Sequence, residues 1–369
     1  MSRSFASVCV VGGGPAGLAA AIALRRQGCK VTLVDCTVPP ADKACGEGLM
    51  PDSIAALHQM GIELPDEVGC PFRGIRFTDG SSSVTADFPV GVAKGVRRTA
   101  LHWLMVQHAA DLGVSLFWNA RNVRLLGTGI SFDGHSIHAD LIVGADGQNS
   151  HVRRQAALDE VAHEKRRFGF RRHYRIAPWS PYMELHWGPT SQIYVTPVSA
   201  AEICLAVISR NSRFRLDQAL DDFPDLKRRV HDAEPASREL GALSVSRRLR
   251  RVQKGKVALI GDASGSVDAI TGEGMCLGLK QAQALASAVK SGNLAAYEQT
   301  HRALMRRPRA MSSLMLTLEH PGLQRRVLAG LARSPQTFES LLAVHVGAVS
   351  FKRICSFNLL GFGRAILAG

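Results

Sequence analysis

The chain lacks the residue patterns that mark several common protein classes. Its eight cysteines form no C-x-x-C pair and no spacing typical of a metal site or a disulfide framework, so we expect no metal and a reducing, cytoplasmic setting. Aromatic residues make up only 6% of the chain, and no helix-turn-helix, finger or RNA-binding signature is present, which argues against a nucleic-acid partner. No H-E-x-x-H, P-loop or nucleophile elbow occurs, which excludes the enzymes built on those motifs.

Long apolar runs are also missing. No run approaches the ~18 residues needed to cross a bilayer, and a strand is expected so close to the N-terminus that no signal peptide fits before it. The stretch "LLAVHVGAVSFKRICSFNLLGFGRAILAG" (341–369) is apolar but is interrupted by Lys352 and Arg353. We interpret it as a packed C-terminal helix, with contact to a membrane or a lipid as the alternative.

Acidic residues are in deficit. The chain has 45 Lys and Arg against 31 Asp and Glu, a net charge of +14, and the excess is concentrated in "KRRFGFRRHYR" (165–175), "SRRLRR" (246–251) and "HRALMRRPR" (301–309). Such charge attracts polyanions, anionic membranes or phosphorylated cofactors without choosing among them. We interpret most of it as solvated surface and keep a peripheral contact with an anionic membrane open.

The segment 7–35 has the pattern of a βαβ unit. The apolar run "SVCVV" is followed by the glycine turn "GGGPAG", an alanine-rich helix and a second apolar strand, "CKVTLVD". Gly12, Gly14 and Gly17 form a G-x-G-x-x-G fingerprint, which brings the phosphates of a dinucleotide onto the backbone at a helix N-terminus. Asp35, at the end of the second strand, is placed to hold a ribose hydroxyl pair. The unit therefore predicts dinucleotide binding.

Two further segments end apolar strands in similar motifs. "LIVGADGQNSHVRR" (141–154) contains Asp146-Gly147, and "KVALIGDASGSVDAITGEG" (256–274) contains Gly261-Asp262. With the fingerprint, these D-G and G-D motifs make the chain resemble the flavoprotein monooxygenase superfamily typified by para-hydroxybenzoate hydroxylase, which includes the geranylgeranyl reductases. The order and spacing of the three motifs match over most of the chain.

The resemblance implies FAD as the cofactor. Arg98, in "RRTALHWLM", matches the R-x-x-L of the superfamily and would reach the pyrophosphate, Asp262 would bind the ribityl chain, and Asp146 would mainly order the structure around the cofactor and NAD(P)H. The residues expected around FAD are Gly12, Gly14, Pro15, Ala16, Gly17, Asp35, Cys45, Gly46, Arg98, Val123, Asp146, Gly261, Asp262, Thr271, Gly272 and Gly274.

The stretch "TGEGM" opens a long alanine-rich helix. Its free backbone N–H groups and positive dipole end can face N1 and the C2 carbonyl of the flavin, with Thr271, Gly272 and Gly274 as the expected donors. Stabilising the anionic reduced ring there favours hydride acceptance. The superfamily commonly has a proline where this chain has Ala269, so we expect a looser loop or one shaped for another substrate.

The stretch "DKACGEGLMP" (42–51) sets a cysteine on flexible backbone. It resembles the C-G-E-G or C-G-G-G motif of the geranylgeranyl reductases, in which the cysteine lies near the isoalloxazine ring. Cys45 is therefore expected at the flavin or in the catalytic cavity, where its thiol is a candidate proton donor; the alternative is a small buried thiol.

The stretch "PTSQIYVTP" (189–197) has the spacing of the P-x-x-Y-x-W-x-F-P motif with which those reductases bind substrate. Both prolines are kept, but Gln192, Tyr194 and Thr196 occupy the three aromatic positions. This erosion suggests a smaller or more polar substrate than a long isoprenoid. Tyr194 is a candidate catalytic residue, or else an ordinary strand residue.

The chain has one dinucleotide fingerprint and no second nucleotide-binding domain, so any NAD(P)H is expected to bind transiently in a groove. Arg171, Arg172, His173 and Arg175 are candidates for its phosphates or for an acidic substrate, with an exposed basic strand as the preferred alternative.

The expected fold class is α/β (α+β overall), with a doubly wound, Rossmann-like FAD domain, an inserted antiparallel β-sheet substrate domain and a helical C-terminal segment. The predicted boundaries are 1–71, 95–157 and 250–300 for the FAD domain, 72–94 and 158–249 for the substrate domain, and 301–369 for the helical segment.

Two mechanisms for a small hydrophobic substrate follow from the resemblance. In the slightly favoured one, NAD(P)H reduces the flavin and a C4a-hydroperoxide hydroxylates or epoxidises an aromatic, polyketide-like or quinone-like compound. In the other, reduced flavin gives a hydride to a carbon–carbon double bond of an isoprenoid or polyene, and Cys45, water or Glu273 gives the proton. A non-catalytic FAD-binding role is a minor alternative.

Overall fold

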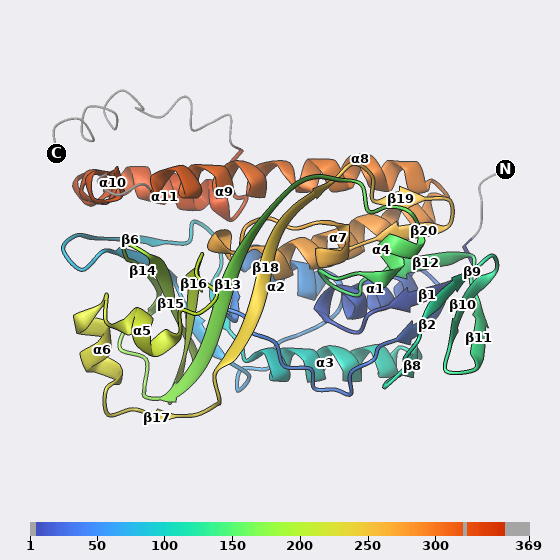
Figure 1. Ribbon diagram of the computed structural model, residues 1–369, viewed down its shortest axis with the longest axis horizontal. Coiled ribbons are helices and arrows are strands. Elements are labelled where there is room, and N and C mark those ends of the chain that lie inside the picture. Colours follow the sequence, from blue (N-terminus) through green and yellow to red (C-terminus); the bar gives the residue numbers. More distant parts are fainter. Residues whose placement is uncertain (1–4, 320–322, 351–369) are drawn as a thin grey trace.

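The computed structural model of the 369-residue chain describes residues 5–319 and 323–350 (Figure 1). Its first elements are the predicted βαβ unit, which is confirmed: strand β1 (Ser7–Val11), helix α1 (Pro15–Arg26) and strand β2 (Lys30–Val34), with β1 and β2 parallel. The apolar strands are buried because neighbours cover them, and β1 pairs on its other side with β12 (Leu141–Gly144).

The six-stranded sheet has the order β19-β20-β12-β1-β2-β8 and draws its strands from three separate parts of the chain. The strands not yet given are β8 (Ser115–Phe117), β19 (Gln253–Lys254) and β20 (Val257–Leu259). Helix α1 packs against α3 (Arg98–Asp111) and α7 (Gly274–Lys290), which places both helices beside the parallel strands. The carboxyl ends of β1, β2 and β12 therefore meet at one edge.

A three-stranded antiparallel sheet contacts β1 and β12. Its strands are β9 (Arg124–Leu126), β10 (Gly129–Phe132) and β11 (His135–His138). Asp133 and Gly134 both take positive φ values and close a two-residue hairpin between β10 and β11. An Asp-Gly pair is a strong signal for such a turn.

The second large sheet has the order β17-β13-β16-β15-β14-β5-β6, and β18 also pairs with β13. Its strands are β5 (Gly74–Thr78), β6 (Ser83–Asp87), β13 (Val161–Arg175), β14 (Tyr182–Trp187), β15 (Ser191–Ser199), β16 (Glu202–Ser209), β17 (Glu234–Pro235) and β18 (Leu240–Leu249). The predicted antiparallel sheet is present except that β5 and β14 pair in parallel, a correction to the expected topology. The long strands β13 and β18 cross between the two sheets (Figure 1).

Helices α8 (Leu294–Leu304), α9 (Arg306–Leu318), α10 (Leu323–Arg333) and α11 (Pro335–His345) lie in a row along one side of the molecule (Figure 1). Phe338 of α11 packs edge-on against Phe77 of β5, and residues of α9 and α10 join the same apolar cluster, so these three helices cover the eight-stranded sheet, whereas α8 packs against α7. Residues 351–369 of the apolar tail lie outside the described residues. No helix in the described part of the chain is long and apolar enough to cross a membrane.

The remaining elements are short. They are β3 (Gly48–Leu49), β4 (Cys70–Phe72), β7 (Ala93–Gly95), α2 (Pro51–Gln59), α4 (His151–Gln155), α5 (Leu216–Leu220), α6 (Pro224–Val230), η1 (Gly261–Ser264) and η2 (Ala269–Thr271). The proposed domain boundaries stay a prediction.

Candidate active site

A large cavity lies between the carboxyl edge of the six-stranded sheet and the eight-stranded sheet. It has a volume of about 1230 Å³, more than the roughly 300–1,000 Å³ of an ordinary small-molecule pocket. Of the residues expected around FAD, all line this cavity except Gly17 and Thr271. We call the part near the fingerprint the nucleotide end and the part between Cys45 and the eight-stranded sheet the ring end.

The three fingerprint glycines have different tasks. A Cβ at Gly12 would lie 2.3 Å from the Ala145 carbonyl oxygen, and one at Gly17 would lie 1.8 Å from the Gly12 carbonyl oxygen. These two glycines therefore allow backbone segments to touch. At Gly14 the nearest atom would be an Arg98 guanidinium nitrogen 4.0 Å away, so the space beside Gly14 is open toward the cavity.

Backbone amides orient the carboxylate of Asp35 at the end of β2. Its oxygens accept hydrogen bonds from the amides of Gly13 (2.5 Å) and Thr37 (2.6 Å), and its side chain faces the cavity. Asp35 is thus held at the edge where a ribose would lie.

Helix α3 carries two residues toward the fingerprint. Arg98, its first residue, faces the cavity, and its Nε is buried without a partner, an unsatisfied donor that an anionic ligand would satisfy. His102 was not among the predicted site residues, but its Nε2 lies 2.8 Å from the Gly13 carbonyl oxygen. Burial lowers the pKa of His102, so it is a neutral donor to that carbonyl. Its position one turn after Arg98 was the available signal.

The D-G and G-D motifs form the rest of the nucleotide end. Asp146 accepts hydrogen bonds from the Ser150 hydroxyl and from the amides of His151 and Val152, so its carboxylate orders the start of α4. The Gly261 amide donates to Gln281 Oε1 (2.7 Å), which fixes the turn that presents Asp262 to the cavity. Val123 lines the same end.

In the loop before α7, two of the three predicted backbone donors are bonded within the protein. The amides of Thr271 and Gly272 donate to the carbonyls of Asp268 and Ala269, so neither is aimed at a ligand. Gly274 and Met275 lie in the first turn of α7 and line the cavity, and first-turn amides have no partner within their helix.

The expected looseness at Ala269 is offset by Asp268. Its side chain accepts from the Ile270 amide and so holds the turn that the family's proline would hold.

Glu273 faces away from this cavity. It lines a separate space of about 220 Å³, where it accepts a hydrogen bond from Arg307 (2.9 Å) and lies 3.8 Å from His345. Burial raises its pKa, but the side chain does not reach a substrate in the main cavity. The assignment of Glu273 as a proton donor to substrate is therefore corrected.

At the ring end, Cys45, Gly46, Glu47 and Gly48 all line the cavity. Cys45 is half-buried, and its Sγ accepts a weak hydrogen bond from the Glu47 amide (3.4 Å). The rest of the ring end is largely apolar, with Met50, Phe170, Met183, Tyr194, Ala206, Val207, Ile208, Leu243 and Val267, although Arg171, Ser244, Ser266 and Asp268 also line the cavity.

The eroded substrate motif is used for internal contacts. Tyr194 faces the cavity, but its hydroxyl donates to the Ile270 carbonyl (2.6 Å), and burial raises its pKa. The Gln192 amide donates to Glu319 (2.9 Å), and the Thr196 hydroxyl donates to the Gly46 carbonyl (2.7 Å). Since all three polar groups are satisfied by protein, they give no support to the expectation of a more polar substrate.

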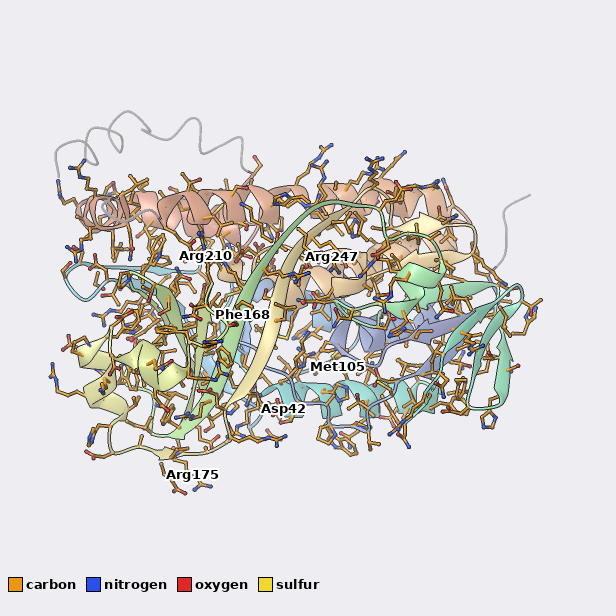
Figure 2. All side chains as sticks on the ribbon, viewed as in Figure 1. Asp42, Met105, Phe168, Arg175, Arg210 and Arg247 are labelled. Atoms are coloured by element: carbon orange, nitrogen blue, oxygen red, sulfur yellow. The ribbon has the colours of Figure 1, made fainter. Side chains whose placement is uncertain are left out.

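The preferred alternative of an exposed basic strand holds for Arg175 of β13 but not for Arg171 and His173. Arg171 and His173 are buried against acids at the ring end, Arg172 pairs with Asp217 (2.8 Å), and Arg175 pairs with Glu234 (2.6 Å). Figure 2 shows Arg175 at the outer end of β13, pointing away from the molecule. Each candidate already has an acidic partner, which corrects their assignment to the phosphates of NAD(P)H.

A second buried ion-pair cluster, centred on Arg167, was not predicted from the sequence. Arg167 of β13 donates to Asp268 (3.0 Å) and to Glu319 (2.5 Å) and so joins the substrate sheet, the loop before α7 and helix α9. Arg210 reaches Glu319 from the exposed side (2.8 Å). No local pattern could have revealed partners that lie more than a hundred residues from Arg167.

The fold and the cavity define a class of protein that binds FAD. A model of the FAD binding domain family matches residues 6–307, and the chain belongs to this family. The open space at Gly14, the unsatisfied Arg98 Nε and the first turn of α7 all fit the cofactor, which accepts and donates electron pairs at its isoalloxazine ring. The protein is an FAD-dependent oxidoreductase.

Individual relatives are distant but nearly full-length. The chain is 27% identical to a menaquinone reductase of Mycolicibacterium smegmatis (81% of this chain, 80% of the relative) and 28% identical to hispidin-3-hydroxylase of Neonothopanus nambi (81% and 83%). It is 29% identical to a digeranylgeranylglycerophospholipid reductase of Methanothrix thermoacetophila (80% and 82%). A flavoprotein/dehydrogenase from Cytophaga hutchinsonii shares the fold, with a TM-score of 0.81 at 18% identity over 99% of this chain and 98% of that one.

Proposed function

We propose that this flavoenzyme reduces a carbon–carbon double bond of an apolar, isoprenoid-type substrate, with NAD(P)H as the source of electrons for FAD. The observation that carries the proposal is the segment Cys45–Gly48, which lines the ring end of the cavity together with mainly apolar residues. Reduction of an isolated double bond requires a hydride on one carbon and a proton on the other. Apolar surroundings exclude water from the hydride transfer, and the Cys45 thiol and the buried Glu47 are groups that can supply the proton.

The residues of the ring end divide this work. Met50, Met183 and Ile208 offer apolar surface to a hydrocarbon chain and exclude water from the bound double bond. Cys45 and Glu47 line the same end of the cavity and are groups that can hold a proton near the substrate. FAD, when bound, supplies the hydride.

The relatives support a reductase. Two of the three are named as reductases, one of menaquinone and one of a digeranylgeranylglycerophospholipid. The C-G-E-G segment that the chain shares with geranylgeranyl reductases lines the cavity here. The loss of aromatic side chains at Gln192 and Thr196 does not oppose an isoprenoid, because both side chains bond to protein.

Hydroxylation is the second candidate function. It is favoured by the hispidin-3-hydroxylase relative, which matches as much of the chain as the reductases do. In that case the same cavity holds an aromatic or quinone-like compound, and oxygen is the second substrate.

Anaerobic and aerobic mixing separates the two functions. The FAD-loaded protein is reduced without oxygen and mixed with menaquinone or with geranylgeraniol, while flavin absorbance and product mass are followed. Reductase activity predicts anaerobic return of the oxidised flavin spectrum and a product with two added hydrogens in its isoprenoid chain, which persist after any quinol has been reoxidised in air. Reoxidation that requires oxygen and gives a product with one added oxygen atom would instead establish hydroxylation. Failure of both would overturn the proposal.

A further inference from the structure

Glu47 is held in a conformation that is unfavourable for glutamate. Its φ is +60°, in the left-handed region that glycine or asparagine adopts at lower cost, and its side chain is 1% exposed. A backbone turn alone would be served better by glycine. The contacts of the Glu47 carboxylate therefore account for a charged residue at this position.

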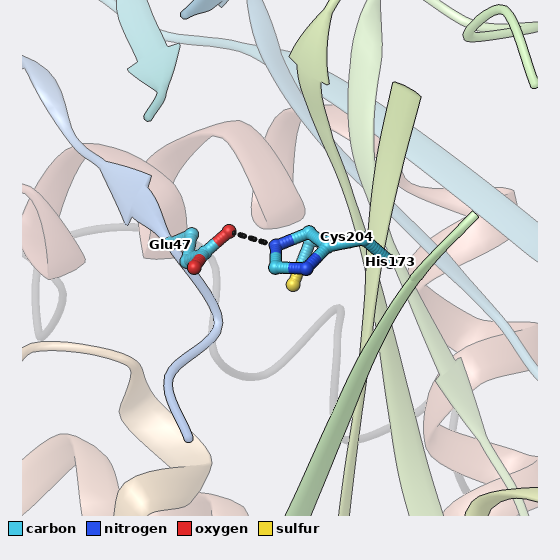
Figure 3. Close-up of side chains that lie close together, drawn as sticks. All are labelled: Glu47, His173 and Cys204. Atoms are coloured by element: carbon cyan, nitrogen blue, oxygen red, sulfur yellow. Dashed lines mark hydrogen bonds and ion pairs between the residues drawn. The ribbon is translucent and has the colours of Figure 1, made fainter. Parts of the chain in front are cut away.

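The carboxylate joins the cavity wall to a buried histidine. Glu47 Oε1 accepts the Arg98 amide (3.0 Å), and Oε2 lies 2.6 Å from His173 Nε2 (Figure 3). Arg171, which can only donate, lies 3.0 Å from His173 Nδ1. Nδ1 is therefore an acceptor, so the proton of the neutral imidazole is on Nε2 and is donated to Glu47.

The chain of contacts continues to the surface. His173 Nδ1 lies 2.9 Å from the hydroxyl oxygen of Ser237, which is half-buried and reaches solvent. Glu47 lines the cavity at the other end. Three side chains from segments far apart in the sequence thus form an unbroken hydrogen-bonded line from solvent to the ring end.

Hydrogen-bond donors and a positive charge surround the two carboxylate oxygens of Glu47. Arg171 Nε lies 3.9 Å from Glu47, and the same guanidinium pairs with Asp42. The Cys204 thiol is close to both Glu47 and His173 (Figure 3), and burial raises its pKa, so it stays protonated. The guanidinium supplies the positive charge of the cluster.

We propose that Ser237, His173 and Glu47 form a proton path from solvent into the flavin cavity. His173 passes its Nε2 proton to Glu47 and takes another on Nδ1 from the Ser237 hydroxyl, which water reprotonates; the imidazole must then return from the Nδ1–H to the Nε2–H tautomer before the next proton can pass. Glu47 then gives its proton to the carbon that has not received the hydride. One proton and one hydride thereby saturate the double bond, and Glu47 returns to the carboxylate. The role in double-bond reduction rests on the proposed function, whereas the path itself does not.

The test measures proton uptake without any substrate. Bound FAD takes up a proton when two electrons reduce it, so photoreduction in weak buffer with a pH-indicator dye reports how fast protons enter the cavity. The variant is His173→Gln, whose amide can still donate to Glu47 but cannot relay a proton. The matched control is His186→Gln, because His186 lies 2.9 Å from Glu184 in the same sheet, and neither residue lines the cavity.

We expect His173→Gln to slow proton uptake on the order of 10²-fold, His186→Gln to leave it unchanged, and imidazole to restore part of the rate in His173→Ala. Equal rates in the two glutamine variants would overturn the path. If the His173 variants do not fold, Ser237→Val decides, because it breaks the path at its outer end; wild-type uptake there would overturn the proposal.

Double-bond reduction is then measured in the same variants. Slowed uptake in a protein that reduces no double bond would leave the path in place and remove the proposed function. Double-bond reduction with unchanged proton uptake in His173→Gln would support the proposed function and overturn the proton path.

Discussion

The nucleotide end and the ring end of the cavity are built by different means. At the nucleotide end, backbone groups of short turns face the ligand, and Gly12 and Gly17 permit contacts that no Cβ would allow. At the ring end, side chains from distant segments hold the wall together, as in Glu47 with His173 and Arg167 with Asp268. Substitutions that add a side chain should therefore disrupt the nucleotide end most, and substitutions that remove a bonding partner should disrupt the ring end most.

The largest expected effect comes from added atoms at the fingerprint. Gly17→Val should prevent folding, because its Cβ would lie 1.8 Å from the Gly12 carbonyl oxygen. Gly14→Val should fold but lose FAD, because the new side chain would occupy the open space that faces the cavity. Circular dichroism and the flavin absorbance of reconstituted protein check both outcomes. Full flavin occupancy in Gly14→Val would contradict the assignment of that space to the pyrophosphate.

The same difference explains what the sequence could predict. The βαβ unit and the turns at Asp146 and Gly261 are local patterns, in which strand, glycine and acid lie within a few residues of one another, and they do meet at the cavity. In "KRRFGFRRHYR" the aromatic residues Phe168, Phe170 and Tyr174 fall on one face of the strand, so the alternation predicts that the other face, with Arg167, Arg171 and His173, is exposed, whereas these three residues are buried. Their burial depends on acids far away in the chain, which only the tertiary fold brings near.

The direction of side chains was likewise beyond the sequence. Thr271 and Glu273 belong to the expected glycine-rich turn, yet the hydroxyl of Thr271 bonds back to the Asp268 carbonyl, and Glu273 points to Arg307. The turn was predictable because its residue types restrict the backbone. The outward rotation of Glu273 depends on helix α9, which lies more than thirty residues further along the chain.

Removing a partner at the ring end should cost stability. Arg167→Met leaves Asp268 and Glu319 without their buried guanidinium, and we expect about 3–5 kcal/mol of destabilisation. The matched control is Arg210→Met, since Arg210 pairs with the same Glu319 but is 71% exposed, and it should change stability by less than about 1 kcal/mol. Denaturant unfolding measures both. Similar losses in the two variants would show that burial does not distinguish the pairs.

Lowering the pH should reduce the stability of the fold through a buried histidine near the nucleotide end. Burial lowers the pKa of His301 to about 3, and this neutral side chain bonds to Ser264 in the turn that presents Asp262. The unfolded chain binds a proton on His301 below about pH 6.5 and the folded chain does not, so stability falls as the pH falls from 6.5 toward 3.

His301→Gln should remove this penalty. Relative to its own value at pH 7, the variant should lose roughly 3 kcal/mol less than wild type on going to pH 4. Free energies of unfolding at both pH values give the difference. The exposed His163, changed to Gln, serves as the control and should follow wild type. Parallel pH profiles for wild type and His301→Gln would show that this histidine is not the group that titrates.

The smallest expected change in stability is that of Cys45→Ser, which we compare with the same substitution at a buried cysteine, Cys9. Cys45 is half-buried on the cavity wall and makes only a weak contact to the Glu47 amide, so Cys45→Ser should change stability by less than about 1 kcal/mol. Cys9 is fully buried in β1, where a hydroxyl would lie among apolar side chains, so Cys9→Ser should cost about 1–3 kcal/mol. If the thiol of Cys45 takes part at the ring end, Cys45→Ser slows turnover of the FAD-loaded protein while Cys9→Ser does not. Unchanged kinetics with a lowered melting temperature in Cys45→Ser would make Cys45 a packing residue and leave Glu47 as the proton-holding group of that wall.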